Sequence, residues 1–243
     1  MKGRALVLAA FWLALWAMQP GEASSQWGDI LKSLPKIPGT TGLSEDEIAR
    51  GLKEALQVGT AKAVELVSQV NGYYGNPQIK IPLPSSVQKV EKLLRAGGYG
   101  PKIDEFELSM NRAAEKAAPE AKALFVDTIK KMTISDAQKI LKGQENEATL
   151  YFKEKTWDHL QEIFQPKVHD AMSQVGTTRS YQDLEQKVHA IPFADKLNLD
   201  LDQYVTGKGL DGLFYMLAQE EKKIRQDPAA RVTDLLKKVF GSR

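Results

Sequence analysis

Apolar residues recur along most of the chain at the three- to four-residue spacing of an amphipathic α-helix. One long stripe runs from Ile103 through Phe106 and Met110 to Met132, with Pro119 on its opposite, solvent-facing side. Because proline lacks a backbone donor, we expect a kinked helix or two nearly collinear helices here. Further helices are expected over residues 44–70, 85–94, 135–143, 147–164, 180–189, 202–225 and 227–240.

Helix boundaries can be predicted from short-range capping patterns. Ser44 followed by Glu47 has the spacing of a capping box, so a helix should begin there. Ser135 is the expected cap of the helix that ends near Gly143. Pro166 is expected to break or restart the helix that begins near residue 147, with a further piece to residue 175.

One segment, YYGNPQIKIPLP at residues 73–84, departs from the helical pattern. Its prolines exclude a continuous helix and favour extended geometry for the residues before them. In an extended chain Ile79, Ile81 and Leu83 point to one side, while Gln78 and Lys80 point to the other. We expect a strap that crosses the helices with its apolar side buried, and any strand to be confined to residues 78–83.

The first residues have the layout of a secretory signal peptide. Lys2 and Arg4 precede an uncharged apolar run, which is followed by Pro20 and a small-residue site ending at Ala23. The run is shorter than the ~20 residues that span a bilayer, and no later stretch is long and apolar enough to do so. We therefore expect a signal peptide over 1–23, a leader strap over 24–42 and one helical domain over 43–243, with a periplasmic, soluble mature protein.

Composition narrows the function classes further. The chain has no cysteine and a formal net charge of +2 at pH 7, with no concentrated basic block. Disulfide and thiolate chemistry are excluded, and nucleic acid is not an expected partner. The fold must be stabilised by its hydrophobic core alone.

Metal and catalytic motifs are also not found. Asn198, Asp200 and Asp202 alternate as in a calcium loop, but Gln203 and Gly209 stand where that loop needs a glycine and a bidentate carboxylate. Asp200 or Asp202 is instead expected to cap the following helix. The histidines are isolated, and no nucleophile elbow, phosphate-binding loop or dinucleotide fingerprint is present. We predict no metal, no cofactor and no identifiable catalytic residue.

A few polar residues on apolar helix faces are the candidate ligand-binding positions. Glu107 and Asn111 lie one turn apart at the edge of the long stripe, and Glu221 falls among apolar residues with Arg225 four residues later. Such carboxylates are usually salt-bridged, but they can also form a polar patch in a cleft. Tyr73 and Tyr74 are candidates for the mouth of a groove rimmed by the strap.

Small residues also recur every four positions in the first helix, at Gly51, Ala55, Gly59 and Ala63. Such a stripe lets another helix approach closely, which offsets the cost of glycine in a helix. An intramolecular partner is expected, and the helix over 202–225, which contains Gly207, Gly209 and Gly212, is a plausible one. Self-association through the same face is the alternative.

Several segments together resemble one bacterial family, catalogued as the domain-of-unknown-function 4197 family. They include LSEDEIARGLKEAL, VNGYYGNPQIKIPLP, DEFELSMNRAAEKAAPEAK, YFKEKTWDHL, VGTTRSYQDL and the block from LDQYVTGKGL to LLKKVFG. The resemblance extends from about Leu43 to Gly241. It implies an exported helical protein of unassigned activity, and it supplies no catalytic residues.

Two function hypotheses follow. The first is a non-enzymatic envelope protein that binds an apolar ligand, a lipid or another envelope protein. The second is a hydrolase-like or metal-dependent enzyme that uses the carboxylates Glu107 and Glu221. These two carboxylates would have to lie within ~5 Å of each other in a cleft for the second hypothesis to gain support. The sequence does not specify the ligand or the oligomeric state.

Overall fold

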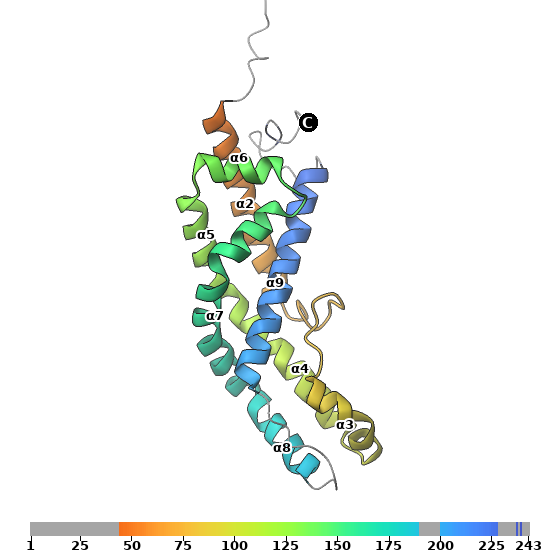
Figure 1. Cartoon of the computed structure of the whole chain (residues 1–243). Helices are drawn as coiled ribbons and strands as arrows, with labels where there is room; N and C mark the ends of the chain where they lie inside the picture. Colours follow the sequence, from red (N-terminus) through yellow and green to blue (C-terminus); the bar gives the residue numbers. More distant parts are fainter. Residues whose placement is uncertain (1–43, 190–199, 228–236, 238, 240–243) are drawn as a thin grey trace, which may run out of the picture. The chain divides into compact units, whose positions relative to one another are not determined.

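The computed structural model describes residues 44–189, 200–227, 237 and 239. Helices make up most of this part of the chain, which contains no strand, and the connections between them are short except for residues 69–84 (Figure 1). The helices are α2 (Glu45–Ser68), α3 (Ser85–Ala96), α4 (Gly100–Ala117), the short 3₁₀-helix η1 (Ala118–Glu120), α5 (Ala121–Lys131), α6 (Ile134–Lys142), α7 (Glu147–Val175), α8 (Thr177–His189) and α9 (Leu201–Gln226). The predicted all-α class is confirmed. The strap between α2 and α3 is extended only in part, because hydrogen-bonded turns continue to Ile79 and only residues 80–84 are free of them.

Some predictions concern residues that the structure does not describe. The signal peptide, the leader strap, the connector over 190–199 and most of the last helix lie outside the described residues. Within the described part, none of the helices has the length and apolar character needed to cross a bilayer.

The first helix begins where its capping pattern predicts. The Ser44 hydroxyl accepts a hydrogen bond from the Glu47 backbone at 3.2 Å, and the Glu47 carboxylate accepts one from the Ser44 backbone at 2.9 Å. Both bonds satisfy N–H groups that the helix itself leaves unpaired. The helix ends at Ser68, slightly before the expected residue 70.

The long apolar stripe after Pro101 is divided at Pro119, as predicted. Pro119 is exposed and lies inside η1, which joins α4 to α5. The 3₁₀ turn accommodates the missing backbone donor, so the stripe stays continuous across the break. The members of the stripe that are fully buried are Ile103, Phe106, Met110, Ala113, Ala117, Ala121 and Phe125.

Two boundary predictions are wrong. Helix α7 continues through Pro166 to Val175 and ends at Gly176, whose φ of 82° suits glycine. Pro166 lies on the exposed side of α7, and the buried residues Phe164 and Val168 on either side of it anchor the helix in the core. This packing offsets the proline penalty of ~3 kcal/mol.

The other error concerns the start of α6. Thr133, and not Ser135, caps it, because Thr133 and Asp136 form a reciprocal capping box. Asp136 can play the part of the usual glutamate in this motif, since its carboxylate reaches the Thr133 backbone at 2.9 Å.

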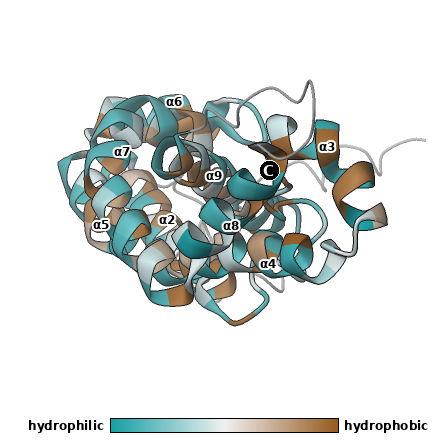
Figure 2. Cartoon of the chain, turned by 90° about the horizontal axis from the view of Figure 1, so that it is seen from below, coloured by the Kyte–Doolittle hydropathy of each residue, from teal (hydrophilic) through white to brown (hydrophobic). Residues whose placement is uncertain are grey.

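The core lies where α2, α4, α7 and α9 pack together. Phe125 makes edge contacts with Phe152 and Phe214, with ring centroids 5.5 and 6.0 Å apart. Seen along the bundle, the outward sides of α6 and α7 are largely hydrophilic (Figure 2). Leu150, near the start of α7, is 45% exposed although it is apolar.

The small-residue stripe of α2 is a close helix contact, as expected, and its partner is α9. Gly51, Ala55, Gly59 and Ala63 are all buried. A Cβ atom on Gly59 would lie 3.4 Å from Ile224 Cδ1. The contact therefore uses the last part of α9 and not the glycines near its start.

Candidate functional site

The strap between α2 and α3 packs on the helices through its apolar side. Ile79, Ile81 and Leu83 are at most 5% exposed, whereas Gln78 and Pro82 are exposed. The prediction of a buried apolar face is therefore confirmed. In Figure 1 this segment lies beside α4 and α9.

Asn111 fixes the middle of the strap. Its side-chain oxygen accepts a hydrogen bond from the Ile81 backbone at 2.8 Å, and its amide donates to the carbonyls of Ile81 and Glu107 at 2.9 and 2.8 Å. Asn111 is fully buried, and these bonds use both amide hydrogens. Its geometry is that of a residue that holds the backbone, and it is not presented to a ligand.

Glu115, which the sequence reasoning missed, fixes the turn before the strap. Its carboxylate accepts bonds from the backbones of Tyr73 and Tyr74 at 3.1 and 3.3 Å. The Arg112 guanidinium lies 2.5 Å from the Glu115 carboxylate and neutralises its charge. It also donates to the side chain of Asn71, whose backbone has a φ of 67°. The spacing was an available signal, because Glu115 follows Asn111 by one helical turn.

Glu107 completes this row on α4. Its carboxylate lies 2.7 Å from Lys80 Nζ, and this hydrogen bond is the main cause of a raised Lys80 pKa. Glu107, Asn111 and Glu115, each one turn from the next, together bind the chain from the tyrosines to Ile81. We call these three residues the strap clamp.

Tyr73 lies in the core, so its predicted place at the mouth of a groove is wrong. The side chain is 0% exposed and its hydroxyl donates to the Gly209 carbonyl at 2.6 Å. Burial, with a smaller contribution from Glu115, raises the pKa of Tyr73 far above its ordinary value. Gly212 makes room for the ring, since a Cβ atom there would lie 2.6 Å from Tyr73 Cε1.

Tyr74 is only partly buried, and its ring centroid lies 4.4 Å from Lys80 Nζ. It is therefore the one predicted tyrosine that a ligand or partner can reach directly. Binding of a ligand or partner by Tyr74 stays a prediction.

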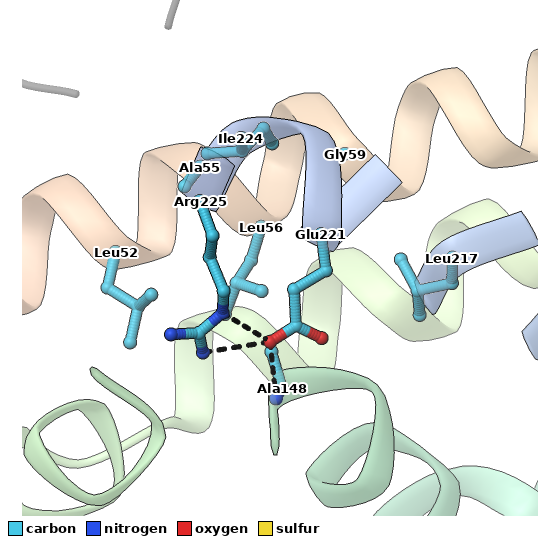
Figure 3. A pocket seen from close by; sticks show the side chains of 9 residues that line it. All are labelled: Leu52, Ala55, Leu56, Gly59, Ala148, Leu217, Glu221, Ile224 and Arg225. Atoms are coloured by element: carbon cyan, nitrogen blue, oxygen red, sulfur yellow. Dashed lines mark hydrogen bonds and ion pairs between the residues drawn. The ribbon is translucent and has the colours of Figure 1, made fainter. Parts of the chain in front are cut away.

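Glu221 connects α9 with the beginning of α7. Its carboxylate accepts bonds from the backbones of Ala148 and Thr149, both at 2.9 Å, and so caps the first turn of α7 from another helix. Arg225 lies 2.8 Å away and donates also to the Ile140 carbonyl. Figure 3 shows the guanidinium and the Ala148 backbone converging on this carboxylate. The salt-bridged interpretation of Glu221 is confirmed.

The space around Glu221 is small. It is lined mainly by apolar residues of α2 and α9, including Leu52, Leu56 and Leu217, and its volume is about 20 Å³. A cavity of this size holds about one water molecule. The cavity therefore does not accommodate an apolar ligand or a lipid chain.

The two candidate carboxylates do not share a site. Glu107 lies near Tyr204, whose pKa is raised by burial and further by Glu107. Tyr204 and Glu221 are separated along α9 by roughly 25 Å at ~1.5 Å per residue. The ~5 Å spacing on which an acid–base pair depends is therefore not met.

The structure places an open groove along the outer side of the strap, with a volume of about 280 Å³. We call it the strap groove, and its walls are Gln78, Ile79, Lys80, Ile81 and Pro82 from the strap and Lys208, Asp211, Gly212 and Tyr215 from α9. Tyr215 is 38% exposed and its hydroxyl lies 3.4 Å from the Gln78 side-chain oxygen. The lining carries lysines on both walls, an exposed phenol and one carboxylate, Asp211, which lies 3.4 Å from Lys153 Nζ.

The residues of the incomplete calcium pattern have other partners. Asp200 caps α9 by accepting from the Gln203 backbone at 2.9 Å, and Asp202 lies 2.9 Å from His169. Asn198 and the side chain of His189 lie outside the described residues. In the described ranges no three histidine or carboxylate side chains are grouped closely enough to hold a metal ion.

Comparison with known proteins places almost the whole described region in one family. The sequence model of a family described as "Protein of unknown function (DUF4197)" matches residues 42–241. No curated protein and no solved structure matches the chain significantly.

Proposed function

The chain belongs to the DUF4197 family of proteins of unknown function. From the geometry of its grooves and from its sequence, we propose that it is a non-enzymatic interaction protein of the cell envelope. Its partner would be an acidic, extended protein segment bound in the strap groove. The observation that carries this proposal is the contrast between the strap groove, of about 280 Å³, and the much smaller apolar cavity, of about 20 Å³.

The roles of the polar residues support binding over catalysis. Asn111, Glu115 and Glu221 are buried, and each bonds to backbone groups of another segment. Glu107 is bound to Lys80. These interactions hold the strap and the start of α7 in place, so the candidate carboxylates are committed to structure. The enzyme alternative keeps no observation in its favour.

The lysines of the groove favour an acidic partner, because the carboxylate in its lining, Asp211, is already paired with Lys153 at 3.4 Å. Lys208 is exposed, and no ion pair links it to another described residue. Lys80 stands on the opposite wall, already held by Glu107 and Tyr74. A carboxylate of the partner could therefore form charge-assisted hydrogen bonds with the ammonium group of Lys208 and with that of Lys80, which its contacts already hold in place.

The proposal can be tested by site-specific photocrosslinking in cells. A photoreactive residue at the exposed position 78 in the groove wall should give one discrete crosslinked protein, and one at the exposed position 170 should not. Replacing Tyr215 with Ser and Lys208 with Glu should abolish the crosslink at 78. Equal crosslinking at both positions, or none at either, would contradict the proposal. Native mass spectrometry would detect a small ligand instead, which would favour the ligand-binding alternative.

Export is part of the same proposal and rests on the sequence alone. Cleavage after Ala23 would release a mature protein that begins at Ser24 into the periplasm. Amino-terminal sequencing of periplasmic protein should find Ser24 first, and replacing Ala23 with Arg should block processing. Recovery of the full-length chain from the membrane fraction would count against it.

A further inference from the structure

A second groove runs between α7 and α9 and has a volume of about 390 Å³. The charge of its lining differs from that of the strap groove. We call it the acidic groove, and its walls are Asp158, Gln161, Glu162 and Gln165 from α7 and Asp200, Gln203 and Thr206 from α9. Its lining in the described part of the chain thus combines carboxylates, carboxamides and one hydroxyl, without lysine or arginine.

The carboxylates of the acidic groove are only partly engaged. Glu162 has one oxygen 3.2 Å from His159 Nδ1, and Asp200 uses one oxygen as the cap of α9. Asp158 takes part in no ion pair with another described residue. Three negative charges therefore face one groove in a chain whose net charge is close to neutral, and such a groove attracts cations.

Thr206 provides an independent indication of a ligand. It lines the groove, is 3% exposed, and its hydroxyl has no hydrogen-bond partner among the described residues. Other buried threonine hydroxyls, such as those of Thr60 and Thr156, donate to the carbonyl one turn earlier at 2.6 Å, whereas Thr177 shares with Thr206 the lack of a partner among the described residues. A buried hydroxyl without a partner is unfavourable, so a group that completes its bonding would be held there.

The arrangement suits an extended cation better than a metal ion. No three carboxylate or histidine side chains in the described ranges are close enough to share one ion. Asp158 and Glu162 lie four residues apart, ~6 Å along α7, while Asp200 is on the opposite wall. Ammonium groups joined by short alkyl spacers match separated carboxylates of this kind.

We propose that the acidic groove binds a linear aliphatic polyamine. Its ammonium groups would pair with Asp158, Glu162 and Asp200, and the carboxamide oxygens and the Thr206 hydroxyl would accept their remaining hydrogens. This site is independent of the strap groove, which has the opposite charge preference. Lysine side chains of a protein carry the same ammonium chemistry, so the test must separate the two sources.

Isothermal titration of the mature protein with spermidine, putrescine, butylamine and a tetralysine peptide provides that separation. Spermidine should bind at one site, more tightly than putrescine and far more tightly than butylamine, and its affinity should fall as salt is added. Tetralysine binding that exceeds spermidine binding would overturn the proposal in favour of a protein partner. Equal affinity for all amines would also overturn it.

Variants with a matched control make the test specific. Asp158→Asn should weaken spermidine binding about tenfold, the effect of losing one charge-assisted bond. Asp170→Asn removes the same charge from an exposed position on the same helix and should change the affinity less than twofold. Equal weakening by both variants would show a general charge effect and overturn the proposal.

Thr206→Val tests the buried hydroxyl. The variant keeps the side-chain volume but removes the unpartnered group, so the free protein should melt at a higher temperature. Spermidine affinity should nevertheless fall severalfold. A higher melting temperature with unchanged spermidine affinity would show that the hydroxyl does not contact the amine, and would remove the second observation on which the site rests.

Discussion

At the scale of single residues, the structure is held by polar side chains that bond to backbone groups of distant segments. Asn111 does this for the strap and Glu221 does it for the first turn of α7. Both were singled out from the sequence because a polar residue on an apolar helix face needs a partner. The helix pattern shows that each of these side chains needs a hydrogen-bonding partner. Which backbone group becomes that partner is determined by tertiary packing.

Asn111→Ala should destabilise the fold by ~1–3 kcal/mol, because it leaves the Ile81 backbone groups buried without partners. Asn146→Ala is the matched control, since Asn146 precedes α7 but makes no side-chain capping bond. It should change the free energy of unfolding by less than ~0.5 kcal/mol. Urea denaturation followed by circular dichroism measures both, and equal effects would mean that Asn111 does not hold the strap.

The cap of α6 should make stability depend on pH. Hydrogen bonds from the Thr133 backbone and hydroxyl lower the pKa of Asp136 below its ordinary value. Because the folded-state pKa is the lower one, the stabilisation is present above the unfolded value of ~3.9 and is lost as the pH falls through the folded value.

Asp136→Asn should therefore lower the melting temperature at neutral pH, and the difference from wild type should shrink as the pH falls below about 4. Asp170→Asn, on the exposed side of α7, should follow the wild-type curve throughout. Thermal melts between neutral and acidic pH provide the comparison, and a difference that persists unchanged in acid would contradict the role given to the Asp136 charge.

At the scale of helices, predictions succeeded where the determining interactions are local. The capping box of Ser44 and Glu47 lies within one turn, and Pro119 removes a donor wherever it stands. The alternation of Ile79, Ile81 and Leu83 likewise predicts one buried face. Pro166 was misjudged because packing on both sides of it outweighs its local cost.

The site was less predictable than the fold. The sequence shows that Tyr73 has an apolar ring, but not that its hydroxyl meets the Gly209 carbonyl far along the chain. Similarly, the strap groove and the acidic groove each combine residues from segments distant in sequence. Their chemistry follows from how α9 packs against the strap and α7, which no local pattern specifies.

The glycines of α9 should respond differently to one added methyl group. A Cβ atom on Gly207 would meet nothing within 4 Å, so Gly207→Ala should gain up to ~1 kcal/mol from helix propensity. A Cβ atom on Gly212 would lie 2.6 Å from the Tyr73 ring and 3.2 Å from Ile79, so Gly212→Ala should cost ~1–3 kcal/mol. Chemical denaturation distinguishes the two, and stabilisation by both substitutions would disprove the close packing of the strap on α9.

At the scale of the whole molecule, the positions of the buried polar groups bear on function. The strap clamp fixes one side of the helical domain, while Glu221 and Arg225 tie α9 to α6 and α7 on another. The open grooves lie between the fixed elements. The strap clamp holds one wall of the strap groove in place, which agrees with the proposed interaction role.

Glu221 provides the sharpest test of that interpretation. Its side chain is 6% exposed and that of Arg225 is 9% exposed, and the carboxylate also accepts backbone bonds from α7. Removing one member of a buried ion pair leaves the other uncompensated, so Glu221→Ala should cost ~3–5 kcal/mol. The exposed pair of Lys62 and Glu65 supplies the control, and Glu65→Ala should cost less than ~1 kcal/mol.

The comparison separates structure from catalysis because a carboxylate kept for chemistry contributes little to folding and often opposes it. If Glu221→Ala unfolds at the same denaturant concentration as Glu65→Ala, the carboxylate is not needed for the fold and the enzyme hypothesis regains its strongest residue. If the expected loss is found, Glu221 is a principal link among three helices. Its presence is then explained by folding, and the grooves become the places in which to look for function.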